Sequence, residues 1–268
     1  MDAAPSVSIS ALRASLSGFP PPQLLDVRRP PAFAANPVVL PRAVRCPPED
    51  VTAFASNLEP WRPVIVYCVH GHDVGRSAAI LLRERGFDAR FLEGGLEAWH
   101  ASGGATEPHR PPTRWVTRER PKIDRIACPW LVRRFIDPSA EFFYVPTADV
   151  RAFARAHSAT PYDIPDVDYS HDGPACSFDA FIRRHALADP ALDRLATIVR
   201  GADTAALDLA PQAPGLLAAS LGLSRMFADD QAMLRWGMLV YDALYAWCNE
   251  AIGETHGWNP APLRAMAS

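Results

Sequence analysis

Residues 64–77, with the sequence VIVYCVHGHDVGRS, decide the fold of the first half of this chain. The first four residues are apolar or aromatic and rich in β-branched side chains, which predicts a buried strand. From Arg76 onwards the apolar residues follow helical spacing, with Ser77 as a possible N-cap. Cys68 therefore begins a tight loop between a strand and the N-terminus of a helix.

The position of Cys68 has chemical consequences. Successive backbone N–H groups of such a loop form an anion-binding concavity, and the helix dipole adds partial positive charge. Both effects favour the thiolate over the thiol. The alternative is a buried and inert cysteine, which is the common case for a free thiol. Gly71 and Gly75 give the loop backbone freedom and favour the reactive interpretation.

Two flanking motifs extend this pattern. The sequence LLDVR occupies residues 24–28, and FLEGGLEAW occupies residues 91–99. In this order the three motifs resemble the rhodanese family of sulfurtransferases, over residues 20–103. The resemblance implies an α/β domain with a mostly parallel sheet and helices on both faces. It also implies that Cys68 is catalytic and carries sulfur as a persulfide, and that Asp26 and Arg28 are mainly structural.

The loop residues after Cys68 are the candidates for substrate binding. Their polar members either bind substrate or are simply exposed. The loop is longer than in many single-domain rhodaneses, and its length resembles the Cys-x5-Arg loop of phosphatases and arsenate reductases. Val74 stands in place of that arginine, so a dianion would lose its bidentate partner and sulfur transfer is the better hypothesis. The candidates are Val69, His70, Gly71, His72, Asp73, Val74, Gly75 and Arg76.

Composition limits the remaining possibilities. The 268 residues carry a net charge of −3 and contain no recognition-helix motif, so we expect no nucleic-acid partner. The five cysteines are scattered and form no CxxC pair, which argues against a disulfide framework. We see neither a signal peptide nor an apolar stretch of membrane-spanning length. We therefore expect a cytoplasmic protein with no membrane partner, and the sequence predicts no particular oligomeric state.

A change of composition divides the chain. Residues 102–112 are rich in Gly and Pro and lack apolar periodicity. We expect a rhodanese-like domain over residues 1–106, a linker over 107–113 and an α-rich α+β domain over 114–268. The second domain should contain strands at 141–145 and 167–171, and helices that begin near Pro129, Thr147, Ser177, Pro190, Pro214 and Asp229. In the last helix, the stripe Met233, Trp236, Val240, Leu244, Trp247 and Cys248 predicts a core face.

Three segments of the second half resemble the ChrB-type C-terminal domain of chromate-resistance proteins. They are KIDRIACPWLVRRFID at residues 122–137, IVRGAD at 198–203 and YDALYAWC at 241–248. The resemblance covers residues 114–250 and implies a link to chromate resistance, in some members as a chromate-responsive regulator. It implies no defined chemical activity.

Basic residues are concentrated at the start of the second half. They either converge on a tetrahedral oxyanion such as chromate or sulfate, or form a solvated basic face. The candidate oxyanion ligands are Arg118, Lys122, Arg125, Arg133 and Arg134.

Other side chains of the second half suggest a metal site or a second thiol. His171, Cys176 and Asp179 are of the types that bind a borderline metal ion, although their spacing matches no zinc pattern. A metal ion in this domain is therefore a hypothesis, whereas sulfur transfer by Cys68 requires no cofactor. Cys128 lies beside basic residues at an expected helix N-terminus and is a second candidate for a reactive thiol.

Two functional hypotheses remain. The first is a thiosulfate sulfurtransferase that takes sulfur from a small donor and passes it to a thiophilic acceptor, chromium–thiol complexes included. The second is a chromate-responsive sensing or binding protein whose rhodanese-like half is a docking module or redox relay. We also expect the second domain to pack close to the Cys68 loop and to narrow its mouth. The alternative is two domains that behave as beads on a string.

Overall fold

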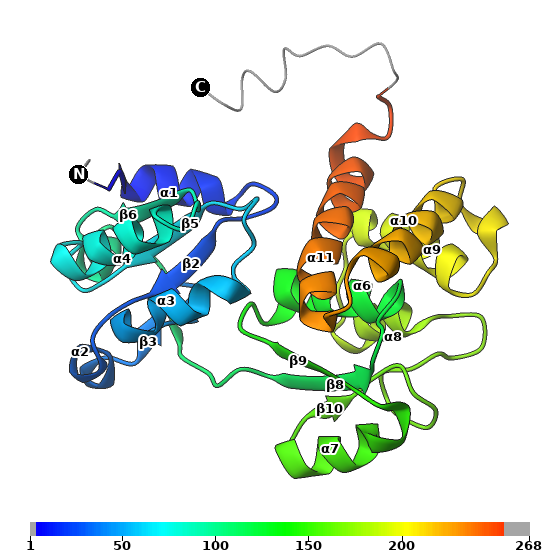
Figure 1. Cartoon of the computed structure of the whole chain (residues 1–268). Helices are drawn as coiled ribbons and strands as arrows, with labels where there is room; N and C mark the ends of the chain where they lie inside the picture. Colours follow the sequence, from blue (N-terminus) through cyan, green and yellow to red (C-terminus); the bar gives the residue numbers. More distant parts are fainter. Residues whose placement is uncertain (1–3, 255–268) are drawn as a thin grey trace.

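The first half of the chain builds a five-stranded parallel sheet in the order β1-β6-β5-β2-β4. The computed structural model describes residues 4–254 (Figure 1). All four residues of the central strand β5 are buried, as expected for an apolar run that is covered on both faces. The strands are β1 Ser6–Val7, β2 Gln23–Asp26, β4 Val44–Arg45, β5 Val64–Tyr67 and β6 Ala89–Leu92.

Helices cover both faces of this sheet. They are α1 Ile9–Leu16, α2 Pro30–Ala35, α3 Val51–Phe54, α4 Asp73–Arg83 and α5 Gly95–Ala101, with 3-10 turns at Pro48–Asp50 and Ala55–Asn57. Ile65 and Tyr67 of β5 share a core with α1 and α5, whereas Val64 and Val66 share the opposite core with α3 and α4. The alternation of side chains along β5 thus supplies two cores, and the predicted rhodanese-like α/β architecture is confirmed.

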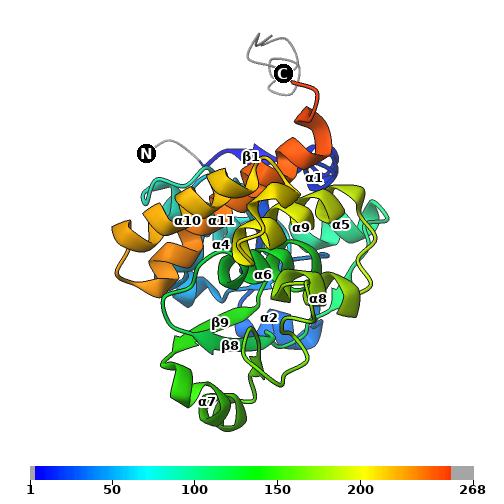
Figure 2. The ribbon, with the colours of Figure 1, turned by 90° about the vertical axis from the view of Figure 1, so that its right-hand side faces the viewer.

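The second half contains a smaller parallel sheet in the order β10-β8-β9. Its strands are β8 Arg114–Arg118, β9 Glu141–Val145 and β10 Thr160–Pro161. Trp115 of β8 belongs to the large helical core, while Val116 packs on the other face against α7 (Val150–His157). In the side view the sheet therefore lies between α7 and a layer of helices (Figure 2).

The helical layer makes this half α-rich, as predicted. Its elements are α6 Asp124–Leu131, α8 Ser177–Arg184, α9 Pro190–Asp203, α10 Ala213–Met226 and α11 Asp230–Ala246. Shorter elements are 3-10 turns at Thr147–Asp149 and Leu207–Leu209 and π-helical turns at Val132–Ile136 and Trp247–Ala251. The core stripe expected along α11 and the π-helical turn after it is partly wrong, because Met233 and Cys248 are buried but Trp236 is 39% exposed. No helix of the described residues has the length and apolarity to cross a bilayer.

Pro129 lies inside α6, not at its first turn as expected. A proline in a helix interior leaves the carbonyl four residues earlier without its N–H donor, and here that carbonyl belongs to Arg125. The hydroxyl groups of Tyr144 and Tyr162 donate to the Arg125 carbonyl at 3.1 and 3.3 Å. Two side chains that are distant in sequence therefore satisfy the group that Pro129 cannot.

Other expected boundaries also shift. Helix α7 begins at Val150 after a 3-10 turn that contains Thr147, so Thr147 is not its cap. Ser177 is the first residue of α8, and Cys176 is its N-cap. The expected strand at residues 167–171 is absent from the structure, where an isolated bridge joins Tyr162 to Tyr169.

A short antiparallel pair connects the segment between the halves to the first half. In it, β3 Val38–Val39 pairs with β7 Glu107–Pro108, so the first residues of the expected linker form a strand. The remaining residues run in extended form to β8 (Figure 1).

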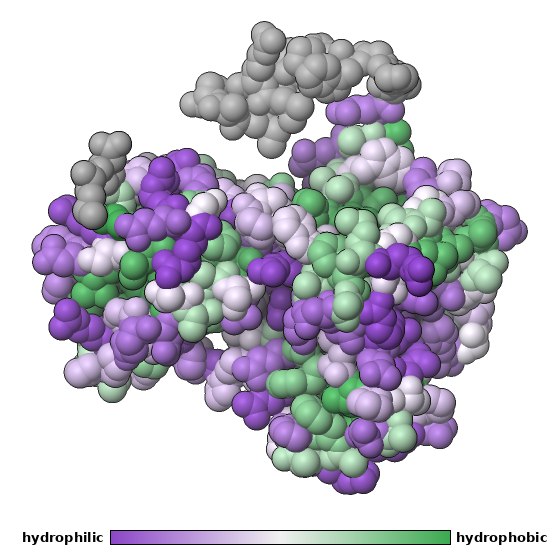
Figure 3. All heavy atoms as spheres, in the orientation of Figure 1, coloured by the Kyte–Doolittle hydropathy of each residue, from purple (hydrophilic) through white to green (hydrophobic). Residues whose placement is uncertain are grey.

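The second half packs against the amino ends of the strands of the first half. Glu59 and Trp61, which precede β5, bind Arg134 and Asp242 of the second half. Phe19, which precedes β2, lies 4.3 Å from Tyr245 between ring centroids. In the space-filling view the two halves touch, with strongly hydrophilic residues at their junction (Figure 3).

Cys68 follows the opposite, carboxyl end of β5. The four residues of this strand separate the loop from the interface by about 13 Å. Within residues 4–254, no hydrogen bond, ion pair or aromatic contact joins residues 68–76 to the second half. The expectation that the second domain narrows the mouth of the Cys68 loop is therefore wrong. The beads-on-a-string alternative is also wrong, because the halves share a buried ionic interface.

Candidate functional site

Cys68 lies directly after β5 and is 6% exposed. Helix α4 begins at Asp73 with His72 as its N-cap, so the loop between strand and helix is short. The expected helix start near Arg76 is therefore wrong. Asp73, Val74, Gly75 and Arg76 form the first turn of α4.

The loop has an unusual number of free backbone donors. Within the described part of the chain, no N–H group from Val69 to Gly75 donates to a protein acceptor, and the first such bond is Arg76 N–H to the carbonyl of His72, at 3.0 Å. Three of these donors are the unsatisfied first N–H groups of α4. Successive free N–H groups at a helix N-terminus form a site for an anion.

Helix α5 fixes the other side of the loop backbone. The N–H groups of Leu96 and Glu97 donate to the carbonyls of Cys68 and Val69 at 2.9 and 3.1 Å. This close approach requires Gly95, which has a φ of +59°, and whose added Cβ would lie 2.4 Å from the carbonyl oxygen of Cys68. The carbonyls of Cys68 and Val69 are therefore satisfied by α5.

The rim of the loop is polar. His70 Nδ1 lies 2.9 Å from Glu97 Oε2, and both side chains are more than half exposed. His72 and Asp73 are exposed as well. The Arg76 guanidinium lies over the Phe91 ring at 5.2 Å and forms no ion pair with a described residue.

Three loop residues that were candidates for substrate binding have packing positions. Val74 is half-buried and packs against the core between the sheet and α4. Gly75 is buried, and an added Cβ there would lie 3.5 Å from Cys68 Sγ. Gly71 is buried with a φ of +68°, and its added Cβ would lie 2.5 Å from the Leu92 carbonyl oxygen.

The Asp26–Arg28 pair is structural, as the resemblance implied. Both side chains are buried, and Arg28 Nε donates to both Asp26 oxygens at 2.9 Å. Arg28 also donates to the backbone carbonyls of Asn36 and Val38. The pair thereby anchors the chain after β2 beneath the loop that leads to β3.

The four other cysteines are buried and unsuited to thiolate chemistry. Burial is the main cause that raises the pKa of Cys46, to about 12, and the pKa values of Cys128, Cys176 and Cys248. Cys128 is fully buried inside α6 and faces the carboxylates of Asp124 and Asp163, which raise its pKa further. The expectation of a second reactive thiol at Cys128 is therefore wrong.

The five candidate oxyanion ligands do not converge. Arg118 and Arg125 bind the same carboxylate, Asp163, at 2.6 and 3.2 Å. Arg133 and Arg134 lie at the interface between the halves. Lys122 is half-buried and forms no ion pair with a described residue.

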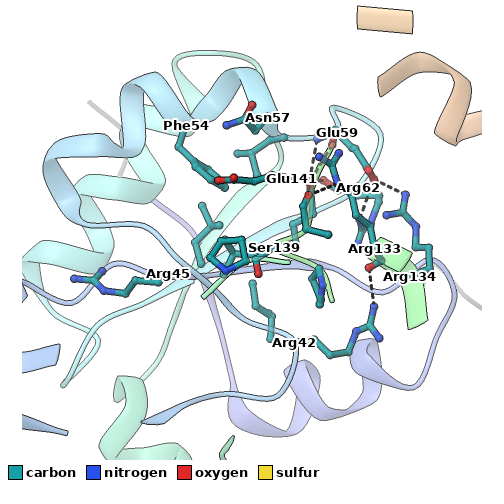
Figure 4. Close-up of a pocket in the computed structure, with 18 of the residues that line it drawn as sticks. Arg42, Arg45, Phe54, Asn57, Glu59, Arg62, Arg133, Arg134, Ser139 and Glu141 are labelled. Carbon is teal, nitrogen blue, oxygen red and sulfur yellow. Dashed lines mark hydrogen bonds and ion pairs between the residues drawn. The ribbon is translucent and has the colours of Figure 1, made fainter. Parts of the chain in front are cut away.

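A cavity of about 580 Å³ lies between the two halves. It is rich in arginine, and Figure 4 shows Arg45 on one side and Arg133, Arg134 and Arg62 on the other. Arg42 also lines it and donates to the carbonyl of Arg133 at 3.4 Å. Within the described residues, neither Arg42 nor Arg133 pairs with a carboxylate, and burial lowers the pKa of both.

A buried ionic network closes one end of this cavity. Arg134 binds Asp242 through Nε and Nη2, each at 2.8 Å, and Glu59 at 2.5 Å. Arg62 also binds Glu59, at 2.8 Å, and burial lowers the pKa of Arg62 to about 10. Burial by itself would raise the pKa of Glu59 and Asp242, but Arg134 outweighs it and holds both below their ordinary values.

The candidate metal ligands are not brought together. The Asp179 carboxylate binds Arg200 at 2.6 and 2.9 Å and the N–H of Cys176 at 2.9 Å. His171 instead meets three other carboxylates. Its Nε2 lies 3.4 Å from Asp124, 3.5 Å from Asp163 and 3.2 Å from Asp203.

The electrostatics of this second group are unusual. The Asp124 carboxylate is the main cause that raises the pKa of His171, to about 9. Burial, together with the neighbouring carboxylates, raises the pKa of Asp203 to about 7. Asp124 and Asp203 fall within two of the motifs in the sequence, at 122–137 and 198–203, but nothing in their spacing indicated that they would meet.

Comparison with known proteins agrees with this division of the chain. A family profile described as a rhodanese-like domain matches residues 10–102, and one described as the ChrB C-terminal domain matches residues 115–248. The chain is 33% identical over 144 residues to protein ChrB of Cupriavidus metallidurans, an alignment that covers 52% of this chain and 43% of that protein. The chain thus spans less than half of the length of this relative.

The first half has relatives of its own. The thiosulfate sulfurtransferase GlpE of Pseudomonas putida is 32% identical over 79 residues, which cover 30% of this chain and 70% of that protein. The crystal structure of the Alr3790 protein from Anabaena is 36% identical, covers 38% of this chain and 80% of its own, and has a TM-score of 0.35. With half of its length matched by the ChrB C-terminal profile, the chain belongs to the ChrB C-terminal domain family and carries a rhodanese-like domain ahead of that domain.

Proposed function

We propose that the chain is a thiosulfate sulfurtransferase in which Cys68 carries the transferred sulfur. The Cys68 thiolate attacks the outer sulfur of thiosulfate, a new S–S bond forms, and the S–S bond of the donor breaks to release sulfite. Cys68 then holds a persulfide. A thiophilic acceptor such as cyanide attacks the terminal sulfur, leaves as thiocyanate and returns the thiolate.

The free N–H groups of Val69 to Gly75 carry this proposal. Both the thiolate and the terminal persulfide sulfur are anions, and preorganised backbone donors stabilise negative charge without reorganisation. The exposed Arg76 at the rim adds a positive charge that attracts the thiosulfate dianion. His70, His72 and Asp73 line the entrance and contact the donor or acceptor. The chemistry needs a reducing setting such as the cytoplasm, where a free thiol persists.

The direct test is the formation of thiocyanate from thiosulfate and cyanide by the purified full chain. We expect Cys68→Ser to lower the rate by at least about a hundredfold, since a hydroxyl cannot carry the sulfur. Cys46→Ser is the matched control, because it removes a buried thiol from the same half and should leave the rate unchanged. Mass spectrometry after thiosulfate alone should show one added sulfur, on Cys68. Equal activity in Cys68→Ser would refute the proposal.

A second candidate function is binding of a tetrahedral oxyanion, chromate in particular, in the cavity between the halves. The unpaired guanidinium groups of Arg42 and Arg133 favour it, since a dianion could accept hydrogen bonds from both. Such binding would link the rhodanese-like half to a chromate response.

Titration of the full chain with chromate and with sulfate tests this second candidate. Binding should weaken in Arg42→Ala and persist in Arg114→Ala, which removes an exposed arginine paired with Glu141. If neither anion binds the full chain, oxyanion binding is excluded while the role of Cys68 is untouched.

A further inference from the structure

Three aspartates converge on His171 in the second half of the chain. Asp124 is the first residue of α6, Asp163 follows β10, and Asp203 is the last residue of α9. His171 lies in the segment between β10 and α8, and its Nε2 is the point where the three carboxylates meet. The side chain of His171 is 41% exposed, whereas those of Asp124, Asp163 and Asp203 are 3%, 5% and 13% exposed. A buried anionic group thus has one side open to solvent.

The distances within this cluster are those of metal ligands. The separations from His171 Nε2 are 3.2 to 3.5 Å, longer than the 2.7–2.9 Å of charge-assisted hydrogen bonds. Donor atoms at 2.0–2.2 Å from one tetrahedral ion lie about 3.4 Å from each other. The ligand atoms of Asp124, Asp163 and His171 all lie within 4.8 Å of one another. These three side chains have the spacing of ligands around one ion, and Asp203 Oδ2 lies 3.2 Å from the same nitrogen of His171.

Asp124 supplies an independent observation. The residue is 2% exposed, and its Oδ2 is fully buried and accepts no hydrogen bond from a described residue. A buried carboxylate oxygen without a donor is costly, and it points at His171 across 3.4 Å. An ion bound between them would satisfy this oxygen.

The surrounding arginines do not neutralise all of the carboxylates of this cluster. Arg118 and Arg125 bind Asp163 through Oδ2, so its Oδ1 faces His171 and the Ser177 hydroxyl. Within residues 4–254, Asp124 and Asp203 pair with no arginine or lysine. Asp203 also ends a helix, where the dipole disfavours a carboxylate. The two arginines act as outer groups that orient one ligand and leave the others to the ion.

We propose that Asp124, Asp163, Asp203 and His171 bind one divalent first-row transition-metal ion. Three carboxylate oxygens and one imidazole nitrogen suit Mn²⁺, Fe²⁺ or Zn²⁺ better than a soft ion that requires thiolates. The nearest cysteines, Cys128 and Cys176, are fully buried with raised pKa values and supply no ligand. The site lies in the second half and is separate from Cys68 and from the cavity between the halves.

The test is a calorimetric titration of the full chain, freed of metal with a chelator, with Mn²⁺ alone and with Zn²⁺ alone. We expect saturation at one ion per chain, with loss of the EPR signal of free Mn²⁺. Asp203→Asn and His171→Ala should each weaken binding by at least about tenfold. His171 is 41% exposed and Asp203 is the least buried of the three aspartates, so these variants should fold, which thermal unfolding verifies.

Two controls match these changes. Asp172→Asn removes the same charge from an exposed residue next to His171, and His157→Ala removes an imidazole from α7. Both should bind metal as the unaltered chain does. The proposal is overturned if neither ion binds at a saturable site, or if binding in Asp203→Asn and His171→Ala equals that of the unaltered chain.

Discussion

The two edges of the first parallel sheet are put to opposite uses. At the carboxyl edge, the Cys68 loop keeps a row of backbone donors free and a polar rim exposed. At the amino edge, Arg134 of the second half meets Glu59 and Asp242, and these three charges are buried and paired. The row of free donors is available to a ligand, whereas the buried charges of Glu59, Arg134 and Asp242 satisfy one another, so this network serves to join the two halves.

This difference also explains how the two halves can influence each other. They do not share the Cys68 loop, but they share the strands β2 and β5 that lead to it. A change at the interface therefore reaches Cys68 only through the sheet. Each prediction below alters one edge and measures the consequence at that edge or the other.

Arg134→Ala at the amino edge should cause the largest loss of stability. The substitution leaves Glu59 and Asp242 buried without their main cation, and breaking a buried pair in this way costs about 3–5 kcal/mol. Urea unfolding of the full chain measures the loss. Arg114→Ala is the matched control, because its partner Glu141 is exposed and the pair contributes at most about 1 kcal/mol. Equal losses in both variants would mean that the interface network is not what joins the halves.

Gly95→Ala at the carboxyl edge should cause the next largest loss, both of stability and of activity. The added Cβ would lie 2.4 Å from the Cys68 carbonyl oxygen and 2.6 Å from the Gly71 nitrogen, so the loop backbone must move. We expect a stability loss of about 2–3 kcal/mol and a fall in thiocyanate formation of at least about tenfold. Gly103→Ala isolates the contribution of backbone strain, because its φ is +72° and nothing lies within 4 Å of the added Cβ. Similar rates in both variants would show that the loop tolerates displacement.

Sequence patterns predicted the carboxyl edge much better than the amino edge. The buried strand, Cys68 and the following helix are adjacent in sequence, so hydrophobic periodicity and glycine content were sufficient to place them. The helix start was wrong because the N-cap is His72, which is not a typical capping residue. The expected place of Pro129 was also wrong, because Tyr144 of β9 and Tyr162 after β10 donate to the carbonyl that Pro129 leaves without a donor.

The contacts that assemble the second half are long-range and leave no local pattern. Arg134 was interpreted as an oxyanion ligand, but its partner Glu59 lies 75 residues earlier. His171 was grouped with Cys176 and Asp179 as a candidate metal ligand, but the fold places it beside Asp124, Asp163 and Asp203, which come from separate elements. A sequence shows that charged residues exist, but only the fold shows which of them meet.

Low pH should weaken the ionic interface at the amino edge of the sheet. The pKa values of Glu59 and Asp242 lie below their ordinary values in the folded chain, so their stabilisation is present above the unfolded pKa and is lost as pH falls through the folded pKa. Thermal unfolding should therefore show a decline in stability below about pH 4.5. The decline should be shallower in Glu59→Gln and unchanged in Glu141→Gln, which alters an exposed pair. If stability declines equally with pH in all three proteins, Glu59 is not the cause of the acid sensitivity.

Arg76→Gln at the rim of the Cys68 loop should have the smallest effect, which is a rise in KM for thiosulfate. Arg76 is exposed and forms no ion pair with a described residue, so its charge acts on the thiosulfate dianion through water. An interaction of this kind is worth about 0.5–1 kcal/mol at low salt, which corresponds to about a two- to fivefold rise in KM with little change in kcat. Arg85→Gln removes the same charge just beyond the far end of α4 and should leave KM unchanged. The effect of Arg76→Gln should also fade as ionic strength rises, because exposed charges are screened. A change in kcat that persists at high salt would instead assign Arg76 a direct contact with the reacting sulfur.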